Sequence, residues 1–152
     1  MQAAAARLVL KPGRDKSLRH RHPWIFSGAI ARAEGNPASG DTVAVVAPDG
    51  AFLAWAGYSA ESQIRARVWS FDPADTIDEA FLRQKLAASI ARRSRLMGEG
   101  DALRLVHGES DGLPGLVADR FGETIVVQIL SAGAERWRGF WGPALIELTG
   151  AT

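Results

Sequence analysis

The turn Pro48-Asp49-Gly50 separates two runs rich in strand-forming residues, Thr42 to Ala47 and Ala51 to Tyr58, and it constrains the fold more than any other feature. Proline and glycine at these positions favour a tight reversal of the chain, while β-branched and aromatic residues on both sides favour strands. The pattern therefore predicts a β-hairpin.

Further short strand candidates surround this hairpin. Arg7 to Leu10 ends at Lys11-Pro12-Gly13, Trp24 to Ala33 is interpreted as one strand, and Gln63 to Phe71 alternates between two faces. The expected core face carries Ile64, Ala66 and Val68, and the other carries Arg65, Arg67, Trp69 and Phe71. We expect Trp69 to cover a neighbouring element. Several short strands with glycine-rich turns predict a small barrel or pseudobarrel that ends at Asp72-Pro73.

The second half of the chain combines helices and strands. A capping box of Thr76 and Glu79 predicts a helix that ends near Gly98. The following segments are predicted to be three strands and a last helix: Leu103 to His107, Leu116 to Asp119, Thr124 to Leu130, and Ala134 to Leu148. The helical positions Leu82, Leu86 and Ile90 share one face, and Arg92, Arg93 and Arg95 oppose the negative end of the helix dipole. The fold class is therefore α+β.

Composition excludes several classes of protein. The 152 residues are 47% hydrophobic, which suffices for one ordinary core or two small ones. The absence of cysteine excludes a disulfide framework and a thiolate zinc site, and the three histidines are too dispersed to predict any other metal site. No uncharged run is long enough to cross a bilayer, so we expect a cytoplasmic protein with no membrane partner.

The stretch from Lys11 to Ile30 concentrates positive charge. Its cations are Lys11, Arg14, Lys16, Arg19 and Arg21, and its only acid is Asp15. Trp24 and Phe26 follow, after one or two helical turns that end before Pro23. Cations that displace counterions from phosphates, beside aromatic rings that stack on unpaired bases, favour nucleic-acid binding. The alternative is a solvated charged surface followed by a buried strand that contains Trp24. We favour phosphate contact for the basic side chains and a position in the core for Trp24.

The segment from His107 to Gly115 contains residues that could suggest catalysis. His107-Gly108-Glu109 matches part of a zinc deaminase motif, but that site also needs cysteine ligands. Gly108, Gly112 and Gly115 lead into a strand rather than a helix, so tight turns are predicted in place of a phosphate loop. We expect Glu109 and Asp111 to bind local amides, and we assign no catalytic residue.

Two blocks, KPGRDKSLRHRHPWIFSGAI and LRLVHGESDGLPGLVADRFG, carry a family resemblance, with SQIRARVWSFD between them and QILSAGAE after them. They resemble the front part of bacterial S-adenosylmethionine-dependent methyltransferases that make 5-methylcytosine in large-subunit ribosomal RNA. The resemblance implies a PUA-like pseudobarrel in residues 1–72 and a central α+β domain in residues 73–152. It also implies a Rossmann-like catalytic domain, which is absent from this chain.

The resemblance further implies a role in holding ribosomal RNA. Charge and periodicity single out the expected RNA contacts as Lys11, Arg14, Lys16, Arg19, Arg21 and Trp24, with Arg65 and Arg67 second. S-adenosylmethionine is implied for the full-length enzyme, but we expect this chain to hold no cofactor. Methylation at carbon 5 of cytosine requires a cysteine thiolate, so we expect the chain to be inactive alone.

Two alternatives to this interpretation stay open. One is a freestanding RNA-binding accessory protein that ends at Thr152. The other is an interaction module in which Trp137, Phe140 and Trp141 anchor a homodimer.

Overall fold

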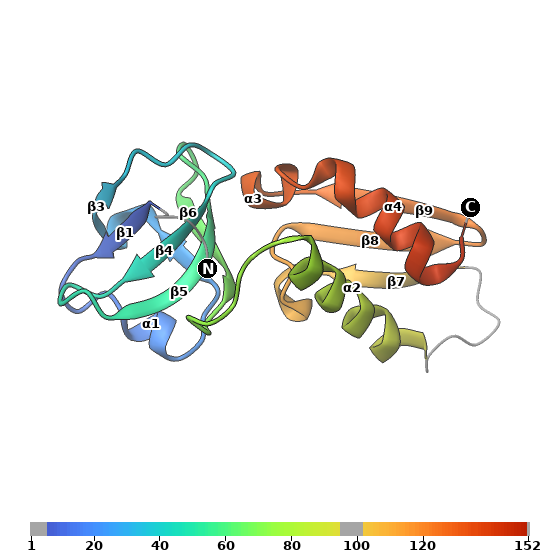
Figure 1. Cartoon of the computed structure of the whole chain (residues 1–152), viewed down its shortest axis with the longest axis horizontal. Helices are drawn as coiled ribbons and strands as arrows, with labels where there is room; N and C mark the ends of the chain where they lie inside the picture. The colour runs from blue at the N-terminus through green and yellow to red at the C-terminus, as the bar shows by residue number, and fades with distance from the viewer. Residues whose placement is uncertain (1–5, 95–101, 152) are drawn as a thin grey trace. The chain divides into compact units, whose positions relative to one another are not determined.

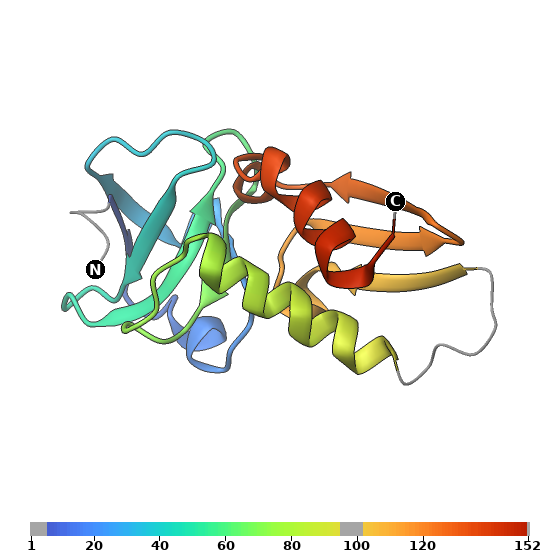
Figure 2. The same cartoon turned by 45° about the vertical axis from the view of Figure 1, so that its right-hand side comes forward.

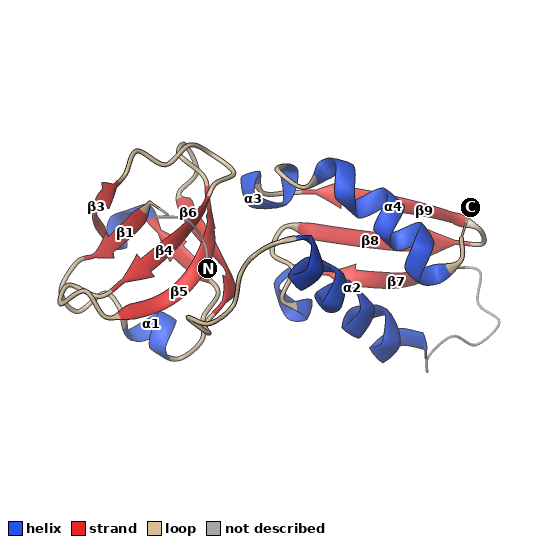
Figure 3. Ribbon diagram, viewed as in Figure 1, coloured by secondary structure: helices blue, strands red, loops and turns tan. Residues whose placement is uncertain are grey.

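The structure is a computed structural model that describes residues 6–94 and 102–151. Internal contacts divide the chain into two compact units, Met1–Ile77 and Asp78–Thr152. The first unit is built mainly of strands, whereas the second combines helices with strands (Figure 3). The boundary predicted at residue 73 falls in the segment between the last strand of the first unit and the first helix of the second.

The first unit is a single six-stranded sheet. Its strands are β1 (Arg7–Leu10), β2 (Trp24–Phe26), β3 (Ile30–Glu34), β4 (Thr42–Val46), β5 (Phe52–Tyr58) and β6 (Ile64–Ser70). They are arranged in the order β2-β6-β5-β4-β1-β3, and only β1 and β4 run parallel. The predicted hairpin of β4 and β5 is confirmed, with Gly50 at a positive φ of 90° in its turn.

The sheet curls because two strands that are consecutive in the chain lie at its opposite edges. Only η1 (Ser27–Ala29), a single turn of 3-10 helix, connects β2 to β3. The sheet therefore bends into a half-barrel, seen in Figure 1, which confirms the predicted pseudobarrel. Apolar side chains from the strands and from α1 (Lys16–Arg19) fill its interior: Leu8, Leu10, Leu18, Ile25, Val43, Val45, Ala54, Ala56, Tyr58, Ala66 and Val68.

The prediction of one continuous strand from Trp24 to Ala33 is wrong. β2 pairs with β6 and β3 pairs with β1, so η1 must redirect the chain between two different partners. The amide of Ser27 donates to the carbonyl of Gln63 at 2.8 Å, and the amide of Lys11 donates to the carbonyl of Ala29 at 2.8 Å. These bonds hold both ends of η1 to the half-barrel.

The alternation in β6 is interrupted by a β-bulge. Ala66 and Val68 are buried as predicted, but Trp69 is also buried, at 3% exposure. Trp55 pairs with Ser70 while Ala56 pairs with Val68, so Trp69 is the additional residue of the bulge. The additional residue breaks strict alternation along the strand, which explains why Trp69 is buried although the alternation predicted it on the polar face.

The second unit is a three-stranded antiparallel sheet with helices on one face. Its elements are α2 (Glu79–Ser94), β7 (Ala102–His107), η2 (Gly108–Asp111), β8 (Leu116–Phe121), β9 (Thr124–Ile129), α3 (Ala132–Glu135) and α4 (Arg138–Thr149). The strand order is β7-β8-β9, and all three predicted strands are confirmed. α2 contacts β7, α4 contacts β9, and both helices lie on the same side of the sheet (Figure 2).

Both long helices differ from their predicted limits. α2 begins at Glu79 because the Asp78 carboxylate, rather than Thr76, accepts from the amide of Phe81 at 2.9 Å. Arg95 and Gly98, predicted near the end of this helix, lie outside the described residues.

The predicted last helix is interrupted before α4. The Trp141 indole donates to the Ala134 carbonyl at 2.8 Å and occupies an acceptor at the end of α3. Trp141 is completely buried, so it does not offer the exposed ring that the alternative of a dimer anchor requires of it.

Gly115 is a sensitive position in the second unit, because its φ is +78° and a Cβ there would lie 2.9 Å from the Ser131 amide nitrogen and 2.2 Å from Ser131 Oγ. We expect Gly115→Ala to lower the free energy of unfolding by about 3 kcal/mol, since both backbone strain and a clash oppose it. Gly139→Ala is the matched control, because a Cβ there meets no atom within 4 Å. Urea denaturation of both variants tests this, and an unchanged midpoint for Gly115→Ala would contradict it.

Candidate nucleic-acid interface

The basic segment after β1 is exposed to solvent. Lys11 follows β1, Arg14 lies in a turn where its amide donates to the Lys11 carbonyl at 3.1 Å, and Lys16 begins α1. Arg19 and Arg21, at and after the end of α1, are exposed as well. In the part of the chain that the structure describes, no carboxylate forms an ion pair with Lys11, Arg14 or Lys16.

Asp15, the only acid of this segment, has a partner. Arg19 Nε donates to Asp15 Oδ2 at 2.6 Å. This hydrogen bond, helped by the Asp15 backbone amide, holds the pKa of the Asp15 carboxyl below its ordinary value. The pair neutralises Arg19 locally and leaves the other cations in excess.

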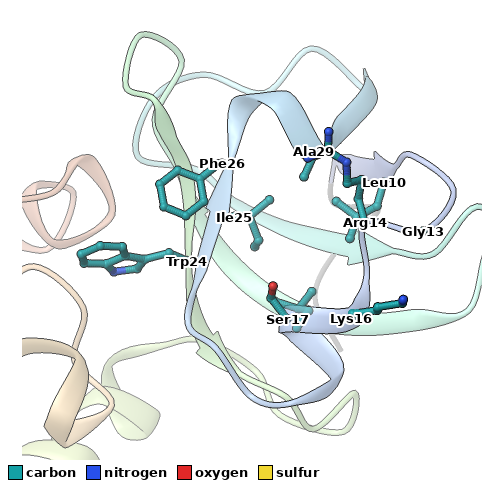
Figure 4. Close-up of a pocket in the computed structure, with 10 residues that line it drawn as sticks. Leu10, Gly13, Arg14, Lys16, Ser17, Trp24, Ile25, Phe26 and Ala29 are labelled. Atoms are coloured by element: carbon teal, nitrogen blue, oxygen red, sulfur yellow. The ribbon is translucent and has the colours of Figure 1, made fainter.

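A cavity of about 310 Å³ lies between the basic segment and β2. The ten residues that line it are Leu10, Gly13, Arg14, Lys16, Ser17, Leu18, Trp24, Ile25, Phe26 and Ala29 (Figure 4). Leu10, Leu18 and Ile25 belong to the buried core, and their exposed fractions are 2–3%. The lining thus joins an apolar wall to two cations and contains no carboxylate.

The aromatic rings of β2 lie on the side of the strand opposite to Ile25 (Figure 4). Trp24 is half-buried and Phe26 is 49% exposed, which does not match the alternative of a buried Trp24 in the core. Their ring centroids are 6.3 Å apart in an edge-on arrangement. Phe26 was missed as a site residue, although its spacing of two from Trp24 on a strand could have placed it on the same face.

The arginines of β6 lie on the strand next to β2. Trp24 pairs with Arg67, whose guanidinium carbon is 5.3 Å from the centroid of the Trp24 ring. Arg65 Nε donates to the Ser62 carbonyl at 3.0 Å. The Arg21 guanidinium lies 5.2 Å from the Phe71 ring centroid.

The cavity therefore brings together only some of the predicted RNA contacts. Arg14, Lys16 and Trp24 line it, and Arg67 lies against the Trp24 ring without lining the cavity. The other predicted contacts do not line it: Lys11, Arg19, Arg21 and Arg65.

The acids of the glycine-rich segment bind local groups, as predicted. Asp111 Oδ2 accepts from the His107 amide at 2.6 Å, and Glu109 Oε1 accepts from the Gly115 amide at 2.9 Å. Asp111 also accepts from Arg92 at 2.7 Å and from Arg93 at 3.0 Å. Burial raises the pKa of the Asp111 carboxyl, but the hydrogen bonds from both arginines outweigh it and the net pKa is lowered.

The described residues do not fit S-adenosylmethionine. The described sheets contain one parallel strand pair, and Gly108 to Gly115 leads into β8 rather than into a helix that could face the cofactor. Within residues 6–94 and 102–151, no group of three His, Cys, Asp or Glu side chains could hold a metal ion. No helix in these residues is long and apolar enough to cross a membrane.

Residues 8–71 match the family model of a PUA-like domain. This segment is therefore similar to PUA-like domains. It coincides with the curled sheet, which agrees with the predicted fold of the N-terminal region.

Longer relatives match nearly all of the chain. The ribosomal RNA large subunit methyltransferase I of Cronobacter sakazakii is 53% identical over 145 residues, which are 94% of this chain and 36% of that protein. The protein of the same name from Shigella boydii is 52% identical over 146 residues, which are 95% of this chain and 37% of that protein. The chain therefore spans about a third of the length of the curated relatives it matches.

Two solved structures share the fold. A proposed SAM-dependent methyltransferase from Streptococcus mutans matches with a TM-score of 0.81 at 14% identity, over 95% of this chain and 38% of its own. A proposed methyltransferase in complex with SAH matches with a TM-score of 0.79 at 14% identity, over the same shares.

The Asp111 network yields a prediction about stability and pH. Asp111→Asn should lower the free energy of unfolding at neutral pH by about 2–3 kcal/mol, because two guanidinium groups lose a charged acceptor whose side chain is 3% exposed. A lowered carboxyl pKa contributes stability that is complete above its unfolded value, about 3.9, and is lost as the pH falls through the folded value. The difference between wild type and variant should therefore begin to shrink as the pH falls below about 3.9, and it should vanish only below the folded pKa of Asp111.

Asp119→Asn is the control for this measurement. Asp119 pairs with Arg104 at 2.8 Å, but that arginine side chain is 44% exposed, so the loss should be about 1 kcal/mol or less. Urea denaturation between pH 3 and 7 is the measurement. Equal losses for both variants at neutral pH would contradict the prediction.

Proposed function

We propose that this chain is the RNA-binding and substrate-orienting region of an S-adenosylmethionine-dependent ribosomal RNA methyltransferase that acts in the cytoplasm. The support comes from the PUA-like domain and from relatives named for methylation of large-subunit ribosomal RNA. In this proposal residues 1–72 bind RNA, and residues 73–152 form the central domain. The target atom is carbon 5 of a cytosine.

One observation carries the proposal. Lys11, Arg14 and Lys16 are exposed and have no ion-pair partner in the described chain, whereas the neighbouring acid is bound to Arg19. Cations that are already paired gain little from a phosphate, because the existing pair must first be broken. These three side chains are therefore the ones ready to replace the counterions of an RNA backbone.

Methyl transfer itself belongs, in this proposal, to other parts of a longer protein. Methylation at carbon 5 requires a thiolate that attacks carbon 6, and these 152 residues contain no cysteine. S-adenosylmethionine, when bound in the longer protein, supplies the methyl group. The role of the present residues is to bind and orient the RNA.

Replacement of Lys11, Arg14 and Lys16 together by glutamine tests the proposal. Each lost phosphate contact should reduce the slope of log affinity against log salt by about 0.7–0.9, so the triple variant should lose about 2–3 units of slope. Titration of a large-subunit ribosomal RNA fragment at several salt concentrations, followed by fluorescence anisotropy, measures both affinity and slope.

A second triple variant, Arg7→Gln, Arg32→Gln and Arg138→Gln, is the control. It removes the same charge, but each of these arginines is bound to Glu34 or Glu135. The control should keep most of the wild-type slope. If both triple variants lost the same slope, net charge rather than this surface would explain binding, and the assignment of the segment would be wrong.

A further inference from the structure

We propose that the cavity beside α1 receives the base of one unpaired RNA nucleotide, while the adjoining phosphates contact Arg14 and Lys16. This inference rests on the proposed function, because it names the class of ligand that the same surface would take.

The first argument is the shape and chemistry of the cavity. Its volume of about 310 Å³ is at the lower end of the range for small-molecule pockets, roughly 300–1,000 Å³. Such a space accommodates a single flat ring system rather than a peptide segment or a helix. Leu10, Leu18 and Ile25 give it an apolar wall. A base that covers this wall removes apolar surface from water, which favours binding.

Small residues keep the cavity open. Gly13, Ser17 and Ala29 come from the turn after β1, from α1 and from η1, and all three line the space. A Cβ at Gly13 would meet no atom within 4 Å, so the wall at this point faces open space. The Ser17 hydroxyl adds one neutral group that can donate to or accept from a base edge.

The second argument is charge. The two charged residues of the lining, Arg14 and Lys16, are both cations, and Asp15 between them is bound to Arg19 instead. A neutral ring flanked by phosphates matches an apolar space beside cations. An acidic peptide would complement the cations, but its side chains would leave the apolar wall uncovered.

The third argument concerns base pairing. A base inside a duplex is stacked on both faces and paired along its edge, so it cannot enter a cavity that ends at buried core residues. Only a bulged, looped or extruded nucleotide presents a base without this cost. The ligand class is therefore an unpaired nucleotide within RNA.

Three RNA hairpins test the inference: a fully paired stem, the same stem with one bulged nucleotide, and the same bulge with an abasic nucleotide. All three keep the phosphate backbone, and the abasic bulge lacks only the base. We expect the 152-residue chain to bind the bulged stem about tenfold more tightly than either other hairpin, a ratio equivalent to about 1.4 kcal/mol.

Ala29→Leu fills the cavity and should remove this preference while leaving affinity for the paired stem unchanged. Ala31→Leu is the matched control, because Ala31 is exposed on β3 and does not line the cavity. Ser17→Leu provides a second filling variant from α1 if Ala29→Leu unfolds. A filled cavity that still prefers the bulge would overturn the inference.

The other outcomes separate this inference from the proposed function. Salt-dependent binding that is equal for all three hairpins would overturn the cavity assignment and leave the RNA-binding role intact. Failure to bind any hairpin at low salt would overturn both. Displacement of the bulged hairpin by micromolar cytidine monophosphate would show a site for free nucleotides and would contradict the assignment to RNA.

Discussion

The first unit depends on the short link between two strands that lie at opposite edges of one sheet. η1 covers that step between β2 and β3 with three residues, so the sheet must curl until its edges approach each other. The bond from the Lys11 amide to the Ala29 carbonyl then fastens the end of β1 to η1. Curling thus brings the basic segment beside β2, and the cavity is the space between them.

Arginine and lysine side chains play different parts in this fold, because carboxylates lie beside only some of them. The formal net charge is only +1, so the proposed RNA binding depends on a local excess of cations rather than on overall charge. Arg92 and Arg93 are held by Asp111, and this network fixes α2 to the segment after β7. The basic segment has one acid, already bound to Arg19, so Lys11, Arg14 and Lys16 have no ion-pair partner among the described residues.

Local sequence patterns predicted the helices and strands that are determined by interactions between residues close in the sequence. The hairpin of β4 and β5 follows from its turn residues, and the three strands of the second sheet follow from periodicity. The sequence predictions were wrong where the structure depends on pairing between strands that are far apart in the chain. η1 interrupts a run of strand-forming residues, and the bulge at Trp69 depends on the register between β6 and β5. Thr76 was predicted as the cap of α2, but the helix geometry places Asp78 in that position.

The sequence predicted the positive charge of the candidate site but not the shape of its cavity. A run of cations with one acid is visible in the chain, whereas the pairing of that acid with Arg19 depends on the turn of α1 that brings them together. The cavity is harder still, because it exists where small residues from three elements meet. In the sequence, Gly13 indicates a turn, Ser17 fits a helix, and Ala29 belonged to a predicted strand. Only the curl of the sheet places these three residues around one space, so no local sequence pattern could have predicted the cavity.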